Sequence, residues 1–193
     1  MPPKAKITRE MIIEEAFEIA RKEGAGSITA RRISEKLGCS TQPVLYYFSS
    51  VEDIKAQAYK AADEFHTRYL MNFSEKSSPM HEIGLNYIRF AAYEKNLFKF
   101  LFQTNEFAGR GITQLIDAEE LTPVLNVLKK TSGVNEKEAK EIFMQIFMFV
   151  HGYASMLANN DIEFDEKKTE YSLANAFKGA VFAVKGENDG KAL

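Results

Sequence analysis

The chain has 193 residues, of which 45% are apolar, and a formal net charge of −2 at pH 7. This length allows one large domain, or a domain of about 50 residues beside a larger one, and the apolar content can build a core without a disulfide scaffold. The small net charge excludes attraction to nucleic acid through the chain as a whole, so a nucleic-acid site must depend on local charge.

Three short helices are predicted in the first 48 residues. The first begins at Thr8, whose hydroxyl can cap its first turn, and runs to Lys22 before two glycines end it. The second covers 30–37 behind the cap Thr29, and the third covers 40–48 with Ser40 as its cap. Proline in the first turn of the third helix is tolerated, because its missing N–H would have no partner inside the helix.

Helical periodicity also dominates the rest of the chain, so the fold class is all-α. A connecting helix is expected over about 51–71, beginning at Ser50 and Asp53, which resemble a capping box. Later helices are expected over 79–103, 113–131, 136–158 and 166–185, with Asn135 and Glu138 as a capping box at the start of the third of these. The chain then divides into a three-helix domain over 1–56, a larger helical domain over 75–186, and a flexible tail over 187–193.

Residues 33–44 have the spacing of a helix-turn-helix. Ile33, Ser34, Leu37, Gly38 and Val44 provide apolar contacts, a small residue at the helix crossing and a glycine turn. Such a frame directs the first turn of the second helix outward. The same spacing also occurs in helix pairs that are purely structural, and that alternative stays open.

The outward side chains would be Thr41 and Gln42. A glutamine in this place can form two hydrogen bonds with adenine. Tyr46 and Tyr47 follow, and their hydroxyls can donate hydrogen bonds to phosphate oxygens, although one ring could instead belong to the core.

The segment GAGSITARRISEKLGCSTQPVLYYFSSVEDI resembles the DNA-binding domain of the tetracycline-repressor (TetR) family, over about residues 5–56. The resemblance implies that Thr29 and Arg31 lie near phosphates, and that Tyr46 and Tyr47 brace against the DNA backbone. The residues that it implies for the major groove are Ser40, Thr41, Gln42 and Pro43.

Two positions depart from the family pattern. Leu45 stands where the family usually has a tyrosine, and Val51 where it usually has a phosphate-binding lysine. Both changes remove phosphate contacts, so we expect Lys55 and the N-terminal Lys4 and Lys6 to provide more of the attraction to DNA, together with the two tyrosines.

The second half of the chain is rich in soft apolar side chains, with 15 Phe, 7 Met and 8 Tyr in the whole sequence. Aromatic and methionine linings suit a small apolar or aromatic effector. The candidate pocket residues are Tyr87, Phe90, Phe98, Phe102, Phe107, Met144, Phe147 and His151. Ordinary core packing is the alternative for each, and His151 could instead be an interface histidine.

The last two helices are the expected dimer face. Ala176, Gly179, Ala180 and Ala183 follow the three-and-four spacing that lets another helix approach closely, and Tyr153 and Leu157 are added from the preceding helix. Packing within one chain is the alternative. In the resembled family the two C-terminal helices form the dimer bundle, which implies a homodimer here.

No metal-ligand spacing, nucleophile motif or phosphate loop occurs, so neither an enzyme nor a cofactor is expected. Cys39 has no flanking Lys or His to suggest a redox role. With no signal-peptide pattern and no apolar run near ~20 residues, a cytoplasmic protein without a membrane span is expected. Our hypothesis is a homodimeric repressor, released from a palindromic operator by a small effector. Residues 1–56 would be its helix-turn-helix DNA-binding domain, and residues 75–186 its ligand-binding and dimerisation domain. The alternative is an all-α protein that binds apolar ligands without binding DNA.

Overall fold

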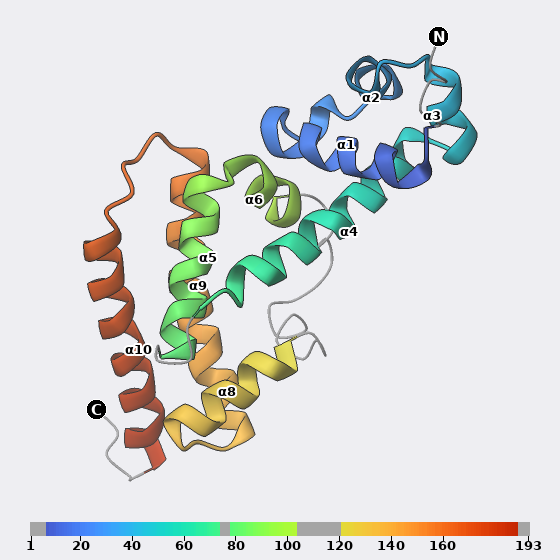
Figure 1. Ribbon diagram of the computed structural model, residues 1–193. Coiled ribbons are helices and arrows are strands. Elements are labelled where there is room, and N and C mark those ends of the chain that lie inside the picture. Colours follow the sequence, from blue (N-terminus) through green and yellow to red (C-terminus); the bar gives the residue numbers. More distant parts are fainter. Residues whose placement is uncertain (1–6, 74–77, 104–120, 189–193) are drawn as a thin grey trace. The chain divides into compact units, whose positions relative to one another are not determined.

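The computed structural model describes residues 7–73, 78–103 and 121–188. Every regular element in these ranges is a helix, which confirms the all-α fold class (Figure 1). The elements are α1 (Arg9–Glu23), the 3-10 helix η1 (Ala25–Ser27), α2 (Ala30–Leu37), α3 (Thr41–Tyr47), α4 (Val51–Leu70), α5 (Pro79–Tyr93), α6 (Lys95–Phe102), α8 (Thr122–Ser132), α9 (Glu136–Asn159) and α10 (Glu166–Asn188). Lys4, Lys6, Phe107, residues 113–120 of an expected helix and most of the expected tail lie outside the described residues.

The helices form two compact units. The N-terminal unit contains α1, α2, α3, α6 and α4 as far as Arg68, and the C-terminal unit contains α5, α8, α9 and α10. The sequence analysis had placed residues 95–102 in the C-terminal domain, whereas these residues, as α6, pack with α1 in the N-terminal unit.

Three of the expected helix caps are present. Thr8 Oγ1 accepts a hydrogen bond from the N–H of Met11 at 3.3 Å, and Thr29 Oγ1 accepts one from the N–H of Arg32 at 3.1 Å. Asn135 and Glu138 form a complete capping box at the start of α9. These caps are local, because each joins residues three apart, and the sequence alone could specify them.

Two other cap predictions were only partly right. Helix α3 begins after Ser40 as expected, but the Ser40 side chain makes no capping hydrogen bond. Ser50 Oγ accepts a hydrogen bond from the N–H of Asp53 at 3.1 Å, which gives α4 one of the two bonds of a capping box.

The helix predicted over 79–103 is two helices, so that prediction was wrong. The backbone leaves the helical conformation at Glu94, with φ −117° and ψ 47°. The Glu94 carboxylate accepts two hydrogen bonds from the guanidinium of Arg21 in α1, and the Asn96 amide donates to the Arg21 carbonyl at 3.0 Å. No proline or glycine marks the break in the sequence, and the hydrogen-bond partner at the break, Arg21, is more than 70 residues away in the chain.

Helix α5 is the most buried helix of the C-terminal unit and packs against α9, α10 and α8. Gly84 allows the close approach of α10, because a Cβ atom there would lie 3.1 Å from Cδ2 of Leu173. The Asn86 amide donates hydrogen bonds to the carbonyls of Leu70 and Asn72, both at 3.2 Å. Asn86 therefore ties the end of α4 to the core of this unit.

Candidate nucleic-acid interface

Helices α2 and α3 form the helix-turn-helix frame that the sequence predicted. Gly38 adopts the left-handed conformation between them, with φ 63°. Ile33 and Val44 are both 0% exposed and pin the two helices to the body of the unit. Ser34 is buried at the crossing, and its hydroxyl donates to the Arg31 carbonyl at 2.8 Å, so the buried polar group is satisfied.

The first turn of α3 faces solvent. Ser40, Thr41 and Gln42 are exposed, and Pro43 is half-buried. The side chains that sequence analysis assigned to base contacts are therefore accessible, with amide and hydroxyl groups of the kind that read base edges.

The end of α3 carries an exposed aromatic pair. Tyr46 is 81% exposed, while Tyr47 is half-buried and meets the Tyr46 ring edge to face at 5.2 Å between centroids. Leu45, at one of the departures from the family pattern, is 54% exposed. Tyr46 thus has the freer hydroxyl for a phosphate contact.

The start of α2 is also accessible. Thr29 is exposed, but its hydroxyl is already used as the cap of the helix. The Arg31 side chain is 86% exposed. Backbone N–H groups at the start of a helix together with a nearby guanidinium are suited to a phosphate. Lys55 is half-buried on α4.

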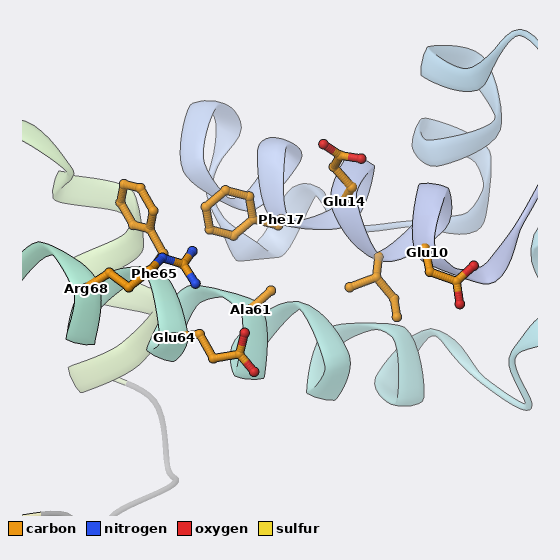
Figure 2. A pocket seen from close by; sticks show the side chains of 8 residues that line it. Glu10, Glu14, Phe17, Ala61, Glu64, Phe65 and Arg68 are labelled. Carbon is orange, nitrogen blue, oxygen red and sulfur yellow. The ribbon is translucent and has the colours of Figure 1, made fainter.

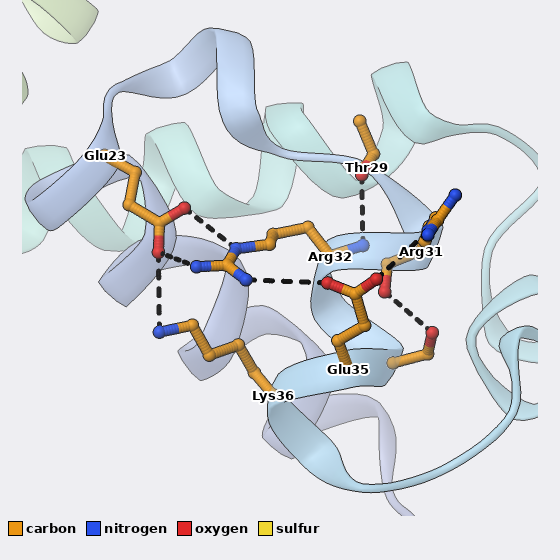
Figure 3. A network of polar contacts seen from close by, with 7 residues as sticks. Glu23, Thr29, Arg31, Arg32, Glu35 and Lys36 are labelled. Atoms are coloured by element: carbon orange, nitrogen blue, oxygen red, sulfur yellow. Dashed lines mark hydrogen bonds and ion pairs between the residues drawn. The ribbon is translucent and has the colours of Figure 1, made fainter.

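Two carboxylates hold the cations of α2 in an ion-pair network (Figure 3). Glu23 at the end of α1 accepts from Arg32 at 2.7 Å and pairs with Lys36 at 3.4 Å. Glu35 accepts from Arg31 at 3.0 Å and pairs with Arg32 at 3.5 Å. These hydrogen bonds hold the pKa of both carboxyl groups below the ordinary value, led by Arg32 for Glu23 and by Arg31 for Glu35.

The network lowers the positive charge that α2 offers to a polyanion, and the sequence analysis did not foresee it. The ion pair of Arg31 with Glu35 could be predicted from the sequence, because the two residues are four apart on one helix. The ion pair of Glu23 with Arg32 joins two helices, so no spacing within one helix predicts it. A third contact that sequence reasoning missed places the Arg9 guanidinium over the Phe48 ring, 4.9 Å from its centroid.

Three of the candidate effector residues meet in the C-terminal unit. The Tyr87 hydroxyl lies 2.8 Å from Nδ1 of His151, and the Phe147 ring stacks on His151 at 5.3 Å between centroids. Burial lowers the pKa of His151 and raises that of Tyr87. Both shifts favour the neutral forms, in which the Tyr87 hydroxyl donates a hydrogen bond to the unprotonated Nδ1 of His151.

The other described candidate pocket residues lie on α5, α6 and α9. Phe98 and Phe102 lie on α6 in the N-terminal unit and contact each other at 5.0 Å between ring centroids. Phe90 is 0% exposed and packs edge to face on Tyr69, as a core residue does. Met144 is half-buried on α9.

The expected dimer face needs a correction. Leu157 and Ala180 are buried inside the C-terminal unit, so their side chains are not available to a partner. Ala180 lies on the same stripe of α10 as Leu173 and Val184, which face the core. Gly179 and Ala183 are exposed, and Tyr153 and Ala176 are half-buried.

Large apolar side chains that the sequence analysis did not select cover the outer surface of these two helices. Met148, Phe149 and Met156 are exposed on α9, and Tyr171 and Phe182 are exposed on α10. A groove of about 440 Å³ runs between the helices, with Phe149, Tyr153 and Met156 on one side and Lys168 and Ser172 on the other. We call this outer surface of α9 and α10 the C-terminal apolar face.

Helix α9 alone among the described helices is long and apolar enough to cross a membrane by length and composition. It packs against α5, α8 and α10, and a core helix passes the same test. Only 33% of its most apolar stretch of 18 residues is buried, so much of α9 faces solvent, including Met148, Phe149 and Met156.

No protein-family model matches the chain. The chain is 22% identical over 174 residues to a Bacillus subtilis (strain 168) protein named "Uncharacterized HTH-type transcriptional regulator YobS". The similar region covers 86% of this chain and 87% of that protein, so it includes both units and not only the helix-turn-helix.

Proposed function

We propose that this protein is a DNA-binding transcription regulator of the TetR type, which represses from a palindromic operator as a homodimer. The observation that carries the proposal is the exposed first turn of α3, with Thr41 and Gln42 in solvent on a frame pinned by buried Ile33 and Val44. The similarity to a protein named as an HTH-type transcriptional regulator supports the same class. We accordingly also propose a cytoplasmic protein that is not an enzyme.

A homodimer suits both the site and the surface. One seven-residue recognition helix buries little area on DNA, whereas a two-fold pair reads two half-sites. The C-terminal apolar face has large exposed side chains such as Phe182, 79% exposed, and exposed patches of this kind mark interaction surfaces. We assign this face to the second copy of the chain.

The cluster of Tyr87, Phe147 and His151 is the proposed contact point of the effector. Two aromatic rings and a polar imidazole suit a small aromatic molecule with a hydrogen-bonding group. Release from DNA then follows if the effector favours a dimer whose two α3 helices no longer match one turn of DNA, about 34 Å.

Selection of binding sites from random duplex DNA with the purified protein tests this function. The expected result is a palindromic consensus whose half-sites are about one DNA turn apart, with affinity that falls steeply as salt is raised. The matched control is the double variant Thr41→Ala/Gln42→Ala, which should fold normally and enrich no such consensus.

Failure to enrich or retard any DNA at low salt would contradict the proposal. It would favour the alternative of an all-α protein that binds apolar ligands, for which the aromatic cluster of the C-terminal unit is the specific support. Binding of an aromatic probe that Phe147→Ala abolishes would then identify that function.

A further inference from the structure

Arg9, the first residue of α1, lies against the end of α3. Its guanidinium carbon is 4.9 Å from the centroid of the Phe48 ring, and Phe48 directly follows α3 and is only 3% exposed. Tyr46 and Tyr47, which the sequence analysis assigned to phosphate contacts, come directly before Phe48 in the chain. The contact therefore holds a half-buried cation beside the part of α3 that we assign to the DNA backbone.

Arg9 differs from the other cations of α1, α2 and α3, because each of those forms an ion pair with a carboxylate. They are Arg21, Lys22, Arg31, Arg32 and Lys36. None of the described residues offers Arg9 a carboxylate within ion-pair distance. Glu10, the next residue, lines the groove between α1 and α4 (Figure 2) and forms no ion pair with Arg9. The charge of Arg9 is therefore available to a ligand.

The first residue of a helix is an unfavourable place for a cation. The N-terminus of a helix has a partial positive charge, which repels the guanidinium of Arg9. The attraction of a guanidinium to a ring face at a partly exposed site is of similar size. Because these two effects offset each other, the folded chain gains little from a cation at this position. An anion gains from both the helix N-terminus and the guanidinium, since both attract it.

The stacked guanidinium keeps its hydrogen-bonding edge available. Its N–H groups lie in the plane of the group, so the Phe48 ring on one face takes none of them. Within the described ranges, no side chain or carbonyl accepts a hydrogen bond from the Arg9 guanidinium. A planar set of donors of this kind matches two oxygens of one phosphate.

We propose that Arg9 binds a phosphate of the DNA backbone, with the Phe48 ring as the platform that positions its guanidinium; this site rests on the proposed function. Arg9 then replaces the phosphate-binding lysine that the family pattern has at Val51. With valine there, the first turn of α4 contains the acids Glu52 and Asp53 and no cation. The sequence analysis had assigned the lost contact to other cations, because the contact of Arg9 with Phe48 joins residues far apart in the chain.

Titrations of the full chain with the selected operator and with an unrelated duplex test this site. Arg9→Gln should weaken binding of both by about tenfold, because one phosphate contact is lost in each half-site and such contacts do not depend on sequence. The slope of log affinity against log salt should become shallower by about 1.8, which is about 0.9 for each lost contact. The base preference at every operator position should stay that of the wild type.

Arg68→Gln is the matched control, because it removes the same charge from the same unit. Arg68 lies in the last turn of α4, and Figure 2 shows it and Glu10, the neighbour of Arg9, at opposite ends of the groove between α1 and α4. This variant should keep the affinity and the salt slope of the wild type. Arg9→Lys keeps the charge and loses the planar set of donors, so it should keep the slope and lower affinity by about threefold.

A double-mutant cycle tests the platform. Phe48→Leu keeps an apolar side chain in the buried place and removes the ring, so it should lower the DNA affinity of the wild type by about threefold. In the Arg9→Gln background the same change should have no further effect. Equal losses in both backgrounds would show that Phe48 does not position Arg9.

Thermal unfolding and circular dichroism of each variant show whether the helices are kept. An unchanged salt slope in Arg9→Gln, or a loss limited to particular operator bases, would overturn the phosphate site and leave the regulator function intact. A wild-type protein that retards no duplex at low salt would overturn the regulator function and this site together. The two failures therefore give different results.

Discussion

Gln42 and Tyr46 contribute in different ways to the surface of α3. Gln42 is exposed in the first turn, where an amide can read one base, and we assign the exposed Tyr46 hydroxyl to a phosphate contact, which is independent of sequence. Gln42→Ala should therefore lower affinity by roughly 1–3 kcal/mol at one half-site position and relax base preference there. Tyr46→Phe should weaken all DNA sequences alike. Titrations of both variants against operators with single-base changes measure these affinities. If both variants lost the same affinity for every operator, the assigned roles would be contradicted.

His66 gives the N-terminal unit a measurable response to acid. It is 7% exposed and packs against Phe102, and burial lowers its pKa from 6.5 to about 4. Between these values the unfolded chain binds a proton that the folded chain does not, so the free energy of unfolding falls as pH falls. The loss from His66 between pH 7 and pH 5 should be about 2 kcal/mol.

Urea unfolding of the wild type and of His66→Gln at both pH values tests this prediction. The comparison cancels the other titrating groups, because both proteins contain them. The variant should lose about 2 kcal/mol less than the wild type between pH 7 and pH 5. Identical losses would show that His66 is not buried in its neutral form.

At the scale of elements, α2 contains the cations that we propose for DNA and also Glu35, which pairs with two of them, Arg31 and Arg32. Glu35 holds Arg31 at 3.0 Å on an exposed helix face, and its own charge repels phosphate. Glu35→Gln should therefore tighten DNA binding by about twofold to fivefold at low salt, with the gain shrinking as salt is raised. The control Glu141→Gln removes an exposed carboxylate from α9 and should have no effect. Weaker binding by Glu35→Gln would mean that the pair orients Arg31 for DNA.

At the scale of the whole molecule, the C-terminal apolar face is the surface that we assign to a second copy of the chain. Phe182→Glu places a charge at its most exposed side chain and should convert the homodimer to monomers. Because two half-sites are then no longer read together, affinity for the palindromic operator should fall at least tenfold, with helix content unchanged.

Sedimentation and circular dichroism measure these effects. The matched control is Met71→Glu, which changes an exposed apolar side chain outside α9 and α10 and should leave the protein dimeric. A wild-type protein that sediments as a monomer, or a Phe182→Glu variant that stays dimeric, would contradict the assignment of this face.

Sequence reasoning worked where the interaction is local. The caps at Thr8 and Thr29, the capping box of Asn135 and Glu138, and the left-handed turn at Gly38 each involve residues within one helical turn. Residue type and spacing specify such contacts directly. The fold class and the accessible first turn of α3 follow from patterns of the same short range.

Only the tertiary structure decided the contacts between distant residues. Arg21 and Glu94 are 73 positions apart, and their pairing accompanies the break that separates α6 from α5. Packing also determined which small residues of α10 face the core, since Ala180 and Gly179 share one sequence pattern but only Ala180 is buried. The physical reason is that a periodic pattern predicts that a helix has an apolar face, whereas the partner of each face depends on how the whole chain packs.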